Sequence, residues 1–391
     1  PLMAALAMVL TVSAKPKPQP RYASGYLYSQ VPFTSVKVSQ NSFWGARLKA
    51  VRDVTVPLAF SKCESTRRYK NFDMAAYTLR HPGHAGLKTA EWDVSKIMGY
   101  PFDDTDVYKT IEGASYILQT YPDKKLRDYI DSVLNIVGAA QESDGYLYTA
   151  RTINPEHPHQ WSGKRRWEKE EDLSHELYDL GHMVDAACAH YQATGSDKFL
   201  NIAKRYADCV VREVGPKSGQ ATVVPGHQIA EMALARLYTL TGERKYLDEA
   251  KYLLEFRGKT KMRQEYSQSH KPILEQKEAV GHAVRAGYMY SGIADVAALT
   301  HDTAYVNTVD RIWHNIYGKK VYLTGGVGAL HWGEAFGKDY ELPNMTAYNE
   351  TCAAISMVYL NERMFLLHGD SKYIDCLERT LYNGVISGMS M

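Results

Sequence analysis

Carboxylates and a thiol gather in one stretch of the sequence, TGGVGALHWGEAFGKDYELPNMTAYNETCAA, which runs from Thr324 to Ala354. Its acidic residues alternate with aromatic residues, and they are Glu334, Asp339, Glu341 and Glu350. Aromatic faces pack on sugar rings, while carboxylates accept hydrogen bonds from hydroxyls or transfer protons. This composition favours a sugar-binding cleft over a solvated run of charge.

Glu334 lies in the irregular segment HWGEAFG, among glycine and apolar residues. A carboxyl group in apolar surroundings holds its proton more readily, which is what a general acid requires. The competing interpretation is a loop carboxylate that makes an ordinary structural hydrogen bond. The residues alone leave both interpretations open.

Glu350 and Cys352 stand two positions apart, where the apolar run AAISMVYLNERMFLL begins a predicted helix. Zinc accepts carboxylate and thiolate ligands, usually four in all. Only two such donors are present here, so a helix-terminal glutamate beside a buried thiol is the competing interpretation. The other cysteines are scattered and form no CxxC motif, so no disulfide framework is expected.

A helical hairpin recurs along the chain, as in LTGERKYLDEAKYLLE at 240–255 and ATGSDKFLNIAKRYAD at 193–208. Each copy joins the end of one helix, a tight turn and the charged start of the next helix. The turns lie at positions 122, 195, 242, 301 and 369. Their spacing is too irregular for a plain solenoid. We therefore predict a mainly α fold, an (α/α)6 barrel of helical hairpins.

Long connections separate these hairpins, at 141–167, 215–228, 257–282 and in the stretch at 324–354. Each connection leads into the first helix of a hairpin, so all of them should meet at one mouth of the barrel. His175, His227 and His282 share a position in the first turn of these helices. We expect them to line one pocket and to bind sugar hydroxyls. A zinc site made of histidines alone lacks the HExxH spacing that would support it.

The whole-chain composition limits the partners. The formal net charge is +2 over 391 residues, without a basic stripe, which argues against nucleic acid. Residues 1–26 read as the remnant of a signal peptide followed by a linker, which predicts a secreted or periplasmic protein. The apolar run is too short to span a membrane. Residues 31–38 read as a short strand, and residues 44–63 as a helix interrupted at Pro57.

Several long motifs together resemble glycoside hydrolase family 127, the β-L-arabinofuranosidases. They are GGVGALHWGEAFGKDYELPNMTAYNETCAA, HELYDLGHM, VPGHQ, YSQSHKP, EAVGHAVRAGYMYSGIADVAALT and ERTLYNGVISG. The resemblance extends from about Val31 to the last residue. It implies that 27–391 form the (α/α)6 catalytic barrel, incomplete at its C-terminus, with β-sandwich domains following in the full-length enzyme.

The same resemblance assigns roles to residues. It implies a retaining hydrolase that removes terminal β-L-arabinofuranosyl residues from plant-type glycans, with a zinc-bound cysteine as the nucleophile. Glu334 corresponds to the general acid/base, and Glu350 and Cys352 to two zinc ligands. The sugar-binding residues correspond to His175, His227 and His282. The nucleophile belongs to a cysteine pair that the family carries downstream of ETC, so we expect it beyond residue 391.

Two alternatives remain. One is a metal-free (α/α)6 carbohydrate-active enzyme that uses paired carboxylates, and the other is a catalytically inactive toroid that binds carbohydrate. Helix toroids often dimerise through appended domains, so the full-length form is compatible with a homodimer. The exact sugar, the linkage and the oligomeric state are open at this stage, and the connections at 141–167 and 257–282 are expected to set the specificity.

Overall fold

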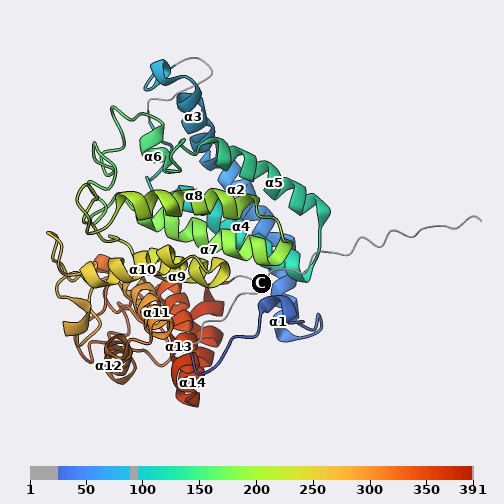
Figure 1. Ribbon diagram of the computed structural model, residues 1–391. Coiled ribbons are helices and arrows are strands. Elements are labelled where there is room, and N and C mark those ends of the chain that lie inside the picture. Colours follow the sequence, from blue (N-terminus) through green and yellow to red (C-terminus); the bar gives the residue numbers. More distant parts are fainter. Residues whose placement is uncertain (1–24, 89–95, 390–391) are drawn as a thin grey trace, which may run out of the picture.

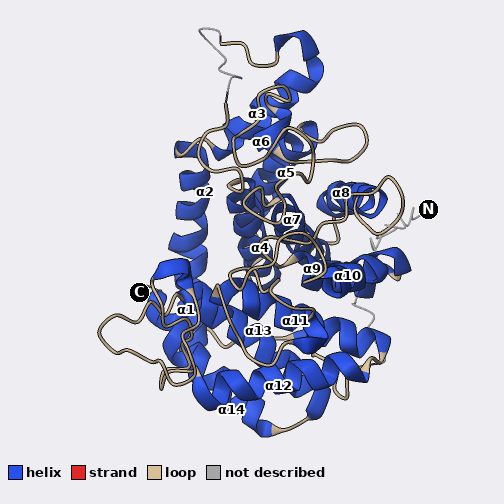
Figure 2. Cartoon of the chain, turned by 90° about the vertical axis from the view of Figure 1, so that its left-hand side faces the viewer, coloured by secondary structure: helices blue, strands red, loops and turns tan. Residues whose placement is uncertain are grey.

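The structure, a computed structural model, describes residues 25–88 and 96–389. Helices dominate this part of the chain, and its β structure is confined to isolated bridges (Figure 2). None of the helices in the described ranges is long and apolar enough to cross a membrane. The expected signal peptide falls in residues 1–24 and lies outside the described residues.

Six helical hairpins follow one another along the described chain (Figure 1). In each hairpin the first helix begins at the end of the barrel where the long connections lie, and the second helix returns along the outside. The pairs are α1–α2 (Phe43–Ala50, Val56–Ser65) with α3 (Arg68–Arg80), α4 (Asp104–Thr120) with α5 (Lys124–Ala139), α7 (Glu176–Thr194) with α8 (Lys198–Glu213), α9 (Ala230–Thr241) with α10 (Arg244–Phe256), α11 (Ala283–Thr300) with α12 (Thr303–Lys319), and α13 (Thr351–His368) with α14 (Ser371–Thr380). Short elements connect them: η1 (Phe33–Ser35), η2 (Val51–Thr55), η3 (Pro82–His84), α6 (Thr149–Thr152), η4 (Ile273–Glu275), η5 (Trp332–Glu334), η6 (Leu381–Val385) and η7 (Ile386–Gly388).

The first helices form the inner wall, because α4 packs on α7, α7 on α9, α9 on α11 and α11 on α13. Almost every residue of α7 and α11 is buried, as a helix surrounded on all sides requires. The outer helices bury one face only, with charged residues on the other. The predicted (α/α)6 barrel is confirmed.

The predicted turns are the helix caps of these hairpins. Gly195, Gly242 and Gly369 end inner helices in the left-handed conformation, with φ of 77°, 76° and 72°. In the turns after α4 and α11, Asp123 and Asp302 accept backbone N–H bonds at the start of the outer helix. Glycine avoids the Cβ penalty of left-handed backbone, and aspartate satisfies free N–H groups, so both leave a sequence signal.

The first hairpin has no sequence signature, because its turn has no glycine or proline. Arg67 takes the left-handed conformation there instead, with φ of 67°. The preceding helix is interrupted at Pro57, as predicted, and the interruption is the π-helical turn η2. A proline lacks the N–H that a regular α-helix needs, and a wider turn before it accommodates the ring. The barrel closes where Trp44 and Tyr382 meet, with ring centroids 5.3 Å apart.

The predicted strand at 31–38 is wrong. The segment contains the 3₁₀ turn η1, in which the Ser35 N–H donates to the Pro32 carbonyl over 2.8 Å. Alternating apolar residues form a strand only beside a partner strand, and none is described here. Instead the Phe33 ring packs edge-on against Tyr116 at 4.9 Å, so a helix side chain covers part of the apolar residue. The β-sandwich implied by the resemblance is outside the described residues.

The long connections meet at one end of the barrel, as predicted (Figure 2). The His282 N–H donates to the Tyr266 carbonyl over 3.1 Å, and the Phe336 N–H donates to the Gly281 carbonyl over 2.9 Å. In the same way, the Gly226 N–H donates to the Glu170 carbonyl over 2.9 Å. The first bond lies within the connection at 257–282, and the other two join neighbouring connections, so side chains far apart in sequence face a common space.

Candidate functional site

The site lies where inner helices begin. His175, His282 and Glu350 are the N-cap residues of α7, α11 and α13. His227 is offset, because it lies two residues before Ile229, the N-cap of α9. The three histidines thus share one end of the barrel, although they precede the first helical turn instead of lying inside it. The partial positive charge of several helix N-termini converges on this space.

The three histidine rings form a continuous row. The centroid of His227 lies 5.9 Å from that of His175 and 5.5 Å from that of His282. Tyr178, which the sequence analysis did not single out, packs against His227 at 4.6 Å and against His175 at 5.6 Å. The motif HELYDLGH contains a signal for Tyr178, which follows His175 by three residues. Residues three apart lie on the same face of a helix.

Burial keeps these imidazoles neutral. Loss of solvent lowers the pKa of His175 to about 3 and that of His282 to about 4, and it holds the pKa of His227 well below its usual range. The nearby Arg285 guanidinium acts in the same direction. A neutral imidazole offers one donor and one acceptor, which matches a sugar hydroxyl. The Nδ1 atom of His175 is buried without a protein partner.

Glu334 faces the end of this row. Its Oε2 atom lies 2.8 Å from Nε2 of His282, and its Oε1 atom accepts a hydrogen bond from the Tyr348 hydroxyl at 3.2 Å. Nδ1 of His282 accepts a hydrogen bond from the backbone N–H of Arg285 at 3.4 Å. The ring proton therefore resides on Nε2 and is donated to Glu334. The carboxyl group is not enclosed by apolar residues, because the Glu334 side chain is 41% exposed and its partners are polar.

A tight turn presents the Glu334 carboxylate. Gly333 has φ of 73° and Glu334 has φ of 51°, so two consecutive residues adopt left-handed backbone. Such a conformation is costly for a residue with a side chain, and it concentrates at functional sites where the surroundings enforce it. The Leu330 and Ala335 backbones close the turn with reciprocal N–H···O bonds of 2.9 and 3.1 Å.

Glu350 and Cys352 adjoin each other at the start of α13. The Oε2 atom of Glu350 is buried and has no protein partner, and burial raises the pKa of this carboxyl. Cys352 keeps exposed surface, yet neighbouring atoms crowd its thiol. Desolvation, followed by the Glu350 carboxylate, raises the pKa of Cys352 to about 12. A thiol in this setting ionises when a cation compensates the two negative groups.

These donors fit a metal ion. An orphaned buried carboxylate oxygen beside a thiol supplies two of the four ligands that zinc usually takes. A second possible metal-binding group shares Glu350 with the first, because ligand atoms of His282, Glu334 and Glu350 lie within 4.8 Å of one another. In that grouping, His282 and Glu334 already satisfy each other through the 2.8 Å contact. Glu350 belongs to both groupings and Cys352 extends the donor set.

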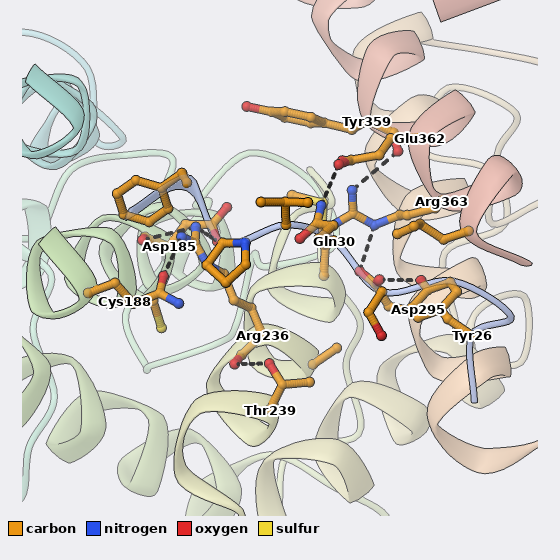
Figure 3. A pocket seen from close by; sticks show the side chains of 18 of the residues that line it. Tyr26, Gln30, Asp185, Cys188, Arg236, Thr239, Asp295, Tyr359, Glu362 and Arg363 are labelled. Carbon is orange, nitrogen blue, oxygen red and sulfur yellow. Dashed lines mark hydrogen bonds and ion pairs between the residues drawn. The ribbon is translucent and has the colours of Figure 1, made fainter. Parts of the chain in front are cut away.

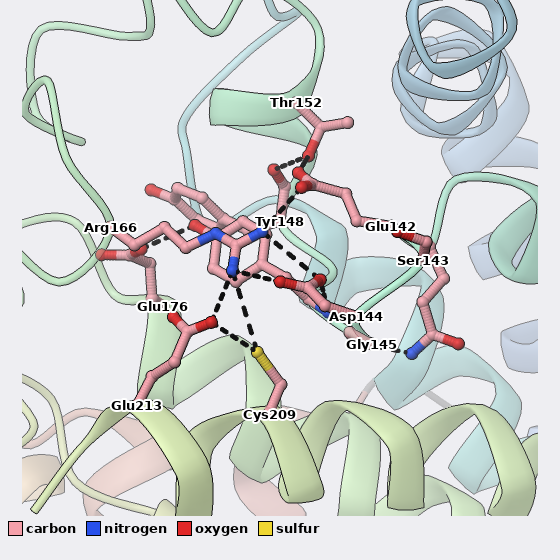
Figure 4. A network of polar contacts seen from close by, with 12 residues as sticks. Glu142, Ser143, Asp144, Gly145, Tyr148, Thr152, Arg166, Glu176, Cys209 and Glu213 are labelled. Carbon is pink, nitrogen blue, oxygen red and sulfur yellow. Dashed lines mark hydrogen bonds and ion pairs between the residues drawn. The ribbon is translucent and has the colours of Figure 1, made fainter. Parts of the chain in front are cut away.

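Another group of metal-type side chains lies away from the site and already holds a cation (Figure 4). The Arg166 guanidinium makes 2.7 Å contacts with Glu142, Asp144 and Glu213, and Cys209 donates to Glu213 at 3.4 Å. The guanidinium takes the place that a metal ion would need. We therefore assign this group to structure, as the clamp of the connection at 141–167.

Two more residues border the site and were missed in the sequence. Tyr266 packs edge-on against His282 at 5.6 Å, and the Arg285 guanidinium lies over the Tyr266 ring at 4.3 Å. Arg285 also donates to the Gly226 carbonyl at 2.6 Å, which fixes the connection that carries His227. Arginine is seldom buried in an apolar helix. The occurrence of Arg285 one turn after His282 was therefore the sequence signal that could have indicated its place in the site.

A cavity of about 650 Å³, partly open to solvent, lies farther along the barrel axis, at the C-terminal halves of the inner helices (Figure 3). None of the predicted site residues lines it. Two ion pairs line it, since Arg236 contacts Asp185 at 2.9 Å and Arg363 contacts Asp295 at 2.8 Å. The segment that includes Tyr26 lines it, and a 2.6 Å hydrogen bond from the tyrosine hydroxyl to Asp295 holds this segment in place.

Comparison with known proteins gives consistent matches. The family model "Beta-L-arabinofuranosidase, GH127 catalytic domain" matches residues 35–391. A non-reducing end β-L-arabinofuranosidase of Bifidobacterium longum subsp. longum is 37% identical over 329 residues, which cover 78% of this chain and 49% of that protein. The chain thus spans about half the length of this curated relative.

Two solved structures share the fold at high similarity. A GH127 β-arabinofuranosidase is 63% identical, with a TM-score of 0.88, over 94% of this chain and 56% of that one. A GH127 β-L-arabinofuranosidase from Geobacillus stearothermophilus T6 is 36% identical, with a TM-score of 0.81, over 89% of this chain and 56% of that one.

Proposed function

The chain belongs to the GH127 β-L-arabinofuranosidase family, and from this membership we propose that it forms the catalytic barrel of a glycoside hydrolase. The enzyme would remove terminal β-L-arabinofuranosyl residues from arabinose-containing plant-type glycans, with retention of configuration. The observation that carries the proposal is the meeting of His282, Glu334 and Glu350 beside a row of buried histidines.

The histidine row provides the sugar-binding part of the site. His175, His227 and His282 are neutral and buried, so they exchange hydrogen bonds with ring hydroxyls without introducing charge. The three rings lie at the starts of separate inner helices, and all of them are buried. This arrangement favours a rigid pocket that orients one furanose ring and loses little entropy on binding.

Glu334 is the proton-transfer residue in this proposal. Its carboxyl group is reachable from solvent and contacts the histidine row, so it can meet the glycosidic oxygen of a bound furanoside. It gives a proton to the leaving oxygen, and in the second step it takes a proton from the attacking water, as the acid/base of a retaining enzyme does. Tyr348 and His282 hold the carboxylate oxygens and thereby fix its direction.

Glu350 and Cys352 would hold zinc in this proposal. When bound, the zinc ion keeps a cysteine nucleophile in its thiolate form at neutral pH. Glu350 contributes a carboxylate oxygen that has no other partner, and Cys352 contributes its sulfur. We infer the remaining ligands and the nucleophilic cysteine from the family resemblance. Export, which the pattern of residues 1–26 predicts, the barrel boundaries of 27–391 and a homodimer of the full-length form are further parts of this proposal.

The test uses the enzyme that carries this chain, with methyl β-L-arabinofuranoside as substrate and its α-anomer as control. We expect release of L-arabinose from the β-anomer alone, and NMR of the first-formed product should show retained configuration. Zinc-free preparations that hydrolyse at the full rate would favour a metal-free enzyme with paired carboxylates. Binding of the β-anomer without hydrolysis would favour an inactive carbohydrate-binding toroid.

A further inference from the structure

A row of aromatic side chains continues outward from the histidines. The Phe102 ring lies 5.0 Å from His175, and Tyr100 lies 5.4 Å from Phe102 with an interplanar angle of 4°. Trp161 follows at 5.6 Å from Tyr100 with an angle of 15°. The rings come from two separate connections, the one before α4 and the one before α7, and they meet in near-parallel orientation.

Exposure rises from His175 through Phe102 to Tyr100, and Trp161 beside Tyr100 is half-buried. His175 is buried, Phe102 is half-buried, and Tyr100 is 56% exposed. Half-exposed aromatic rings that adjoin a sugar pocket offer apolar surface to the C–H faces of a further ring. The row also begins at His175, whose Nδ1 atom is buried without a partner. A ligand that leaves the pocket in this direction therefore meets aromatic surface at once.

Both connections are held in place without a ligand. The Tyr100 N–H donates to Asp103 at 2.7 Å, and Arg68 contacts the same Asp103 oxygen at 2.8 Å. In the connection before α7, the backbone N–H of Trp161 donates to Nδ1 of His159 at 3.2 Å. The backbone N–H of His159 donates to the Ala150 carbonyl at 3.2 Å. Preorganised rings cost little entropy on binding, which is the condition for a useful subsite.

We propose that Phe102, Tyr100 and Trp161 form a binding subsite for the sugar residue that adjoins the terminal furanose of the glycan. The proposal rests on the proposed function, because it takes the histidine row as the site of the terminal furanose. The subsite gives the enzyme a preference for a saccharide over a simple alkyl aglycone. Tyr100 and Trp161 carry this preference, since they are the outer members of the row.

The test is calorimetric titration of the full chain with two probes. One probe is methyl β-L-arabinofuranoside, and the other is a disaccharide in which the same residue is linked to a second arabinose. We expect wild type to bind the disaccharide about 10-fold more tightly, and Tyr100→Ala and Trp161→Ala each to remove most of that gain. Affinity for the methyl glycoside should stay within about twofold in both variants, since the histidines are unchanged.

Two exposed aromatic residues elsewhere at the mouth supply controls. Tyr340 is 71% exposed and lies outside the row, so Tyr340→Ala should bind both probes as wild type does. Trp332 is 91% exposed and precedes Glu334 in η5. A gain that disappears in Trp332→Ala and persists in Tyr100→Ala and Trp161→Ala would overturn the subsite.

The remaining outcomes separate the two proposals. Binding of the methyl glycoside with no gain for the disaccharide overturns the subsite and leaves the proposed function standing. Failure of wild type to bind either probe overturns the proposed function and the subsite with it. Trp161→Phe, which keeps an aromatic ring at this position, should retain more of the gain than Trp161→Ala.

Discussion

Nε2 of His282 donates a hydrogen bond to Oε2 of Glu334 over 2.8 Å, although the two residues belong to different connections. The bond joins the start of α11 to the turn η5, and it places the carboxylate proposed to transfer protons against the histidines proposed to bind the sugar. Because Nδ1 of His282 accepts a hydrogen bond from the backbone N–H of Arg285, the imidazole can donate to Glu334 only through Nε2. A sugar hydroxyl bound at His282 would compete with the Glu334 carboxylate for this Nε2–H donor. Sugar binding would therefore change the hydrogen bonding of the Glu334 carboxylate.

Replacement of Glu334 by glutamine removes the proton that the leaving group needs. We expect Glu334→Gln to lower kcat by about 10²- to 10⁴-fold for poorly activated alkyl or sugar leaving groups. The loss should be smaller for a nitrophenyl leaving group, which departs without protonation. Steady-state kinetics with both substrate types measures the difference. Equal rates for the variant and wild type on the alkyl glycoside would show that Glu334 is not the acid/base.

Removal of the Glu350 carboxylate should weaken zinc binding. Glu350→Ala deletes the buried oxygen that has no protein partner, so we expect the zinc content after dialysis to fall well below that of wild type. Elemental analysis measures this without any need for activity. The matched control is Cys209→Ser, because the group around Cys209 already holds the Arg166 guanidinium. Equal zinc content in Glu350→Ala and wild type would remove Glu350 from the ligand set.

Acid should destabilise the barrel through its buried histidines. Burial lowers the pKa of His175 to about 3, whereas an unfolded histidine titrates near 6.5. The unfolded state therefore binds the proton first, and the free energy of unfolding falls as the pH drops from about 6.5 toward 3. One such group contributes up to about 1.4 kcal/mol per pH unit.

The variant His175→Asn tests that pH dependence. Asparagine tolerates the left-handed backbone at this position, where φ is 64°, and it carries no titratable proton in this range. Urea unfolding between pH 7 and pH 4 should show a shallower decline for the variant than for wild type. His157→Asn, which changes an exposed histidine, should keep the wild-type decline. Identical declines for His175→Asn and wild type would contradict the prediction.

Loss of the Arg166 clamp should destabilise the connection at 141–167. Arg166→Met leaves Glu142, Asp144 and Glu213 facing one another without their shared cation, at a cost of about 1–3 kcal/mol in the free energy of unfolding. Urea denaturation measures the change. The control is Arg244→Ala, whose ion pair with Asp248 is about 60% exposed on both sides, and it should cost under about 0.5 kcal/mol. Equal effects of the two variants would show that the clamp carries no special stability.

Local features of the fold were readable in the sequence because their causes are local. Gly195, Gly242 and Gly369 mark left-handed helix ends, and Asp302 marks a helix start, so the recurring hairpin and the barrel followed from residue types. The family motifs supplied the candidate site residues for the same reason, since each motif is contiguous. The first hairpin, whose turn uses Arg67, carries no such mark and became visible only in three dimensions.

Distances between connections depended on the tertiary structure. The sequence named Glu334 and His282 separately, but only the closing of the barrel brings them within 2.8 Å. Burial is also a tertiary property, so the half-exposed Glu334 and the strongly desolvated His227 differ in ways that their neighbours in sequence do not reveal. The aromatic row from His175 to Trp161 follows the same rule, because rings from two connections stack only after packing has set their positions.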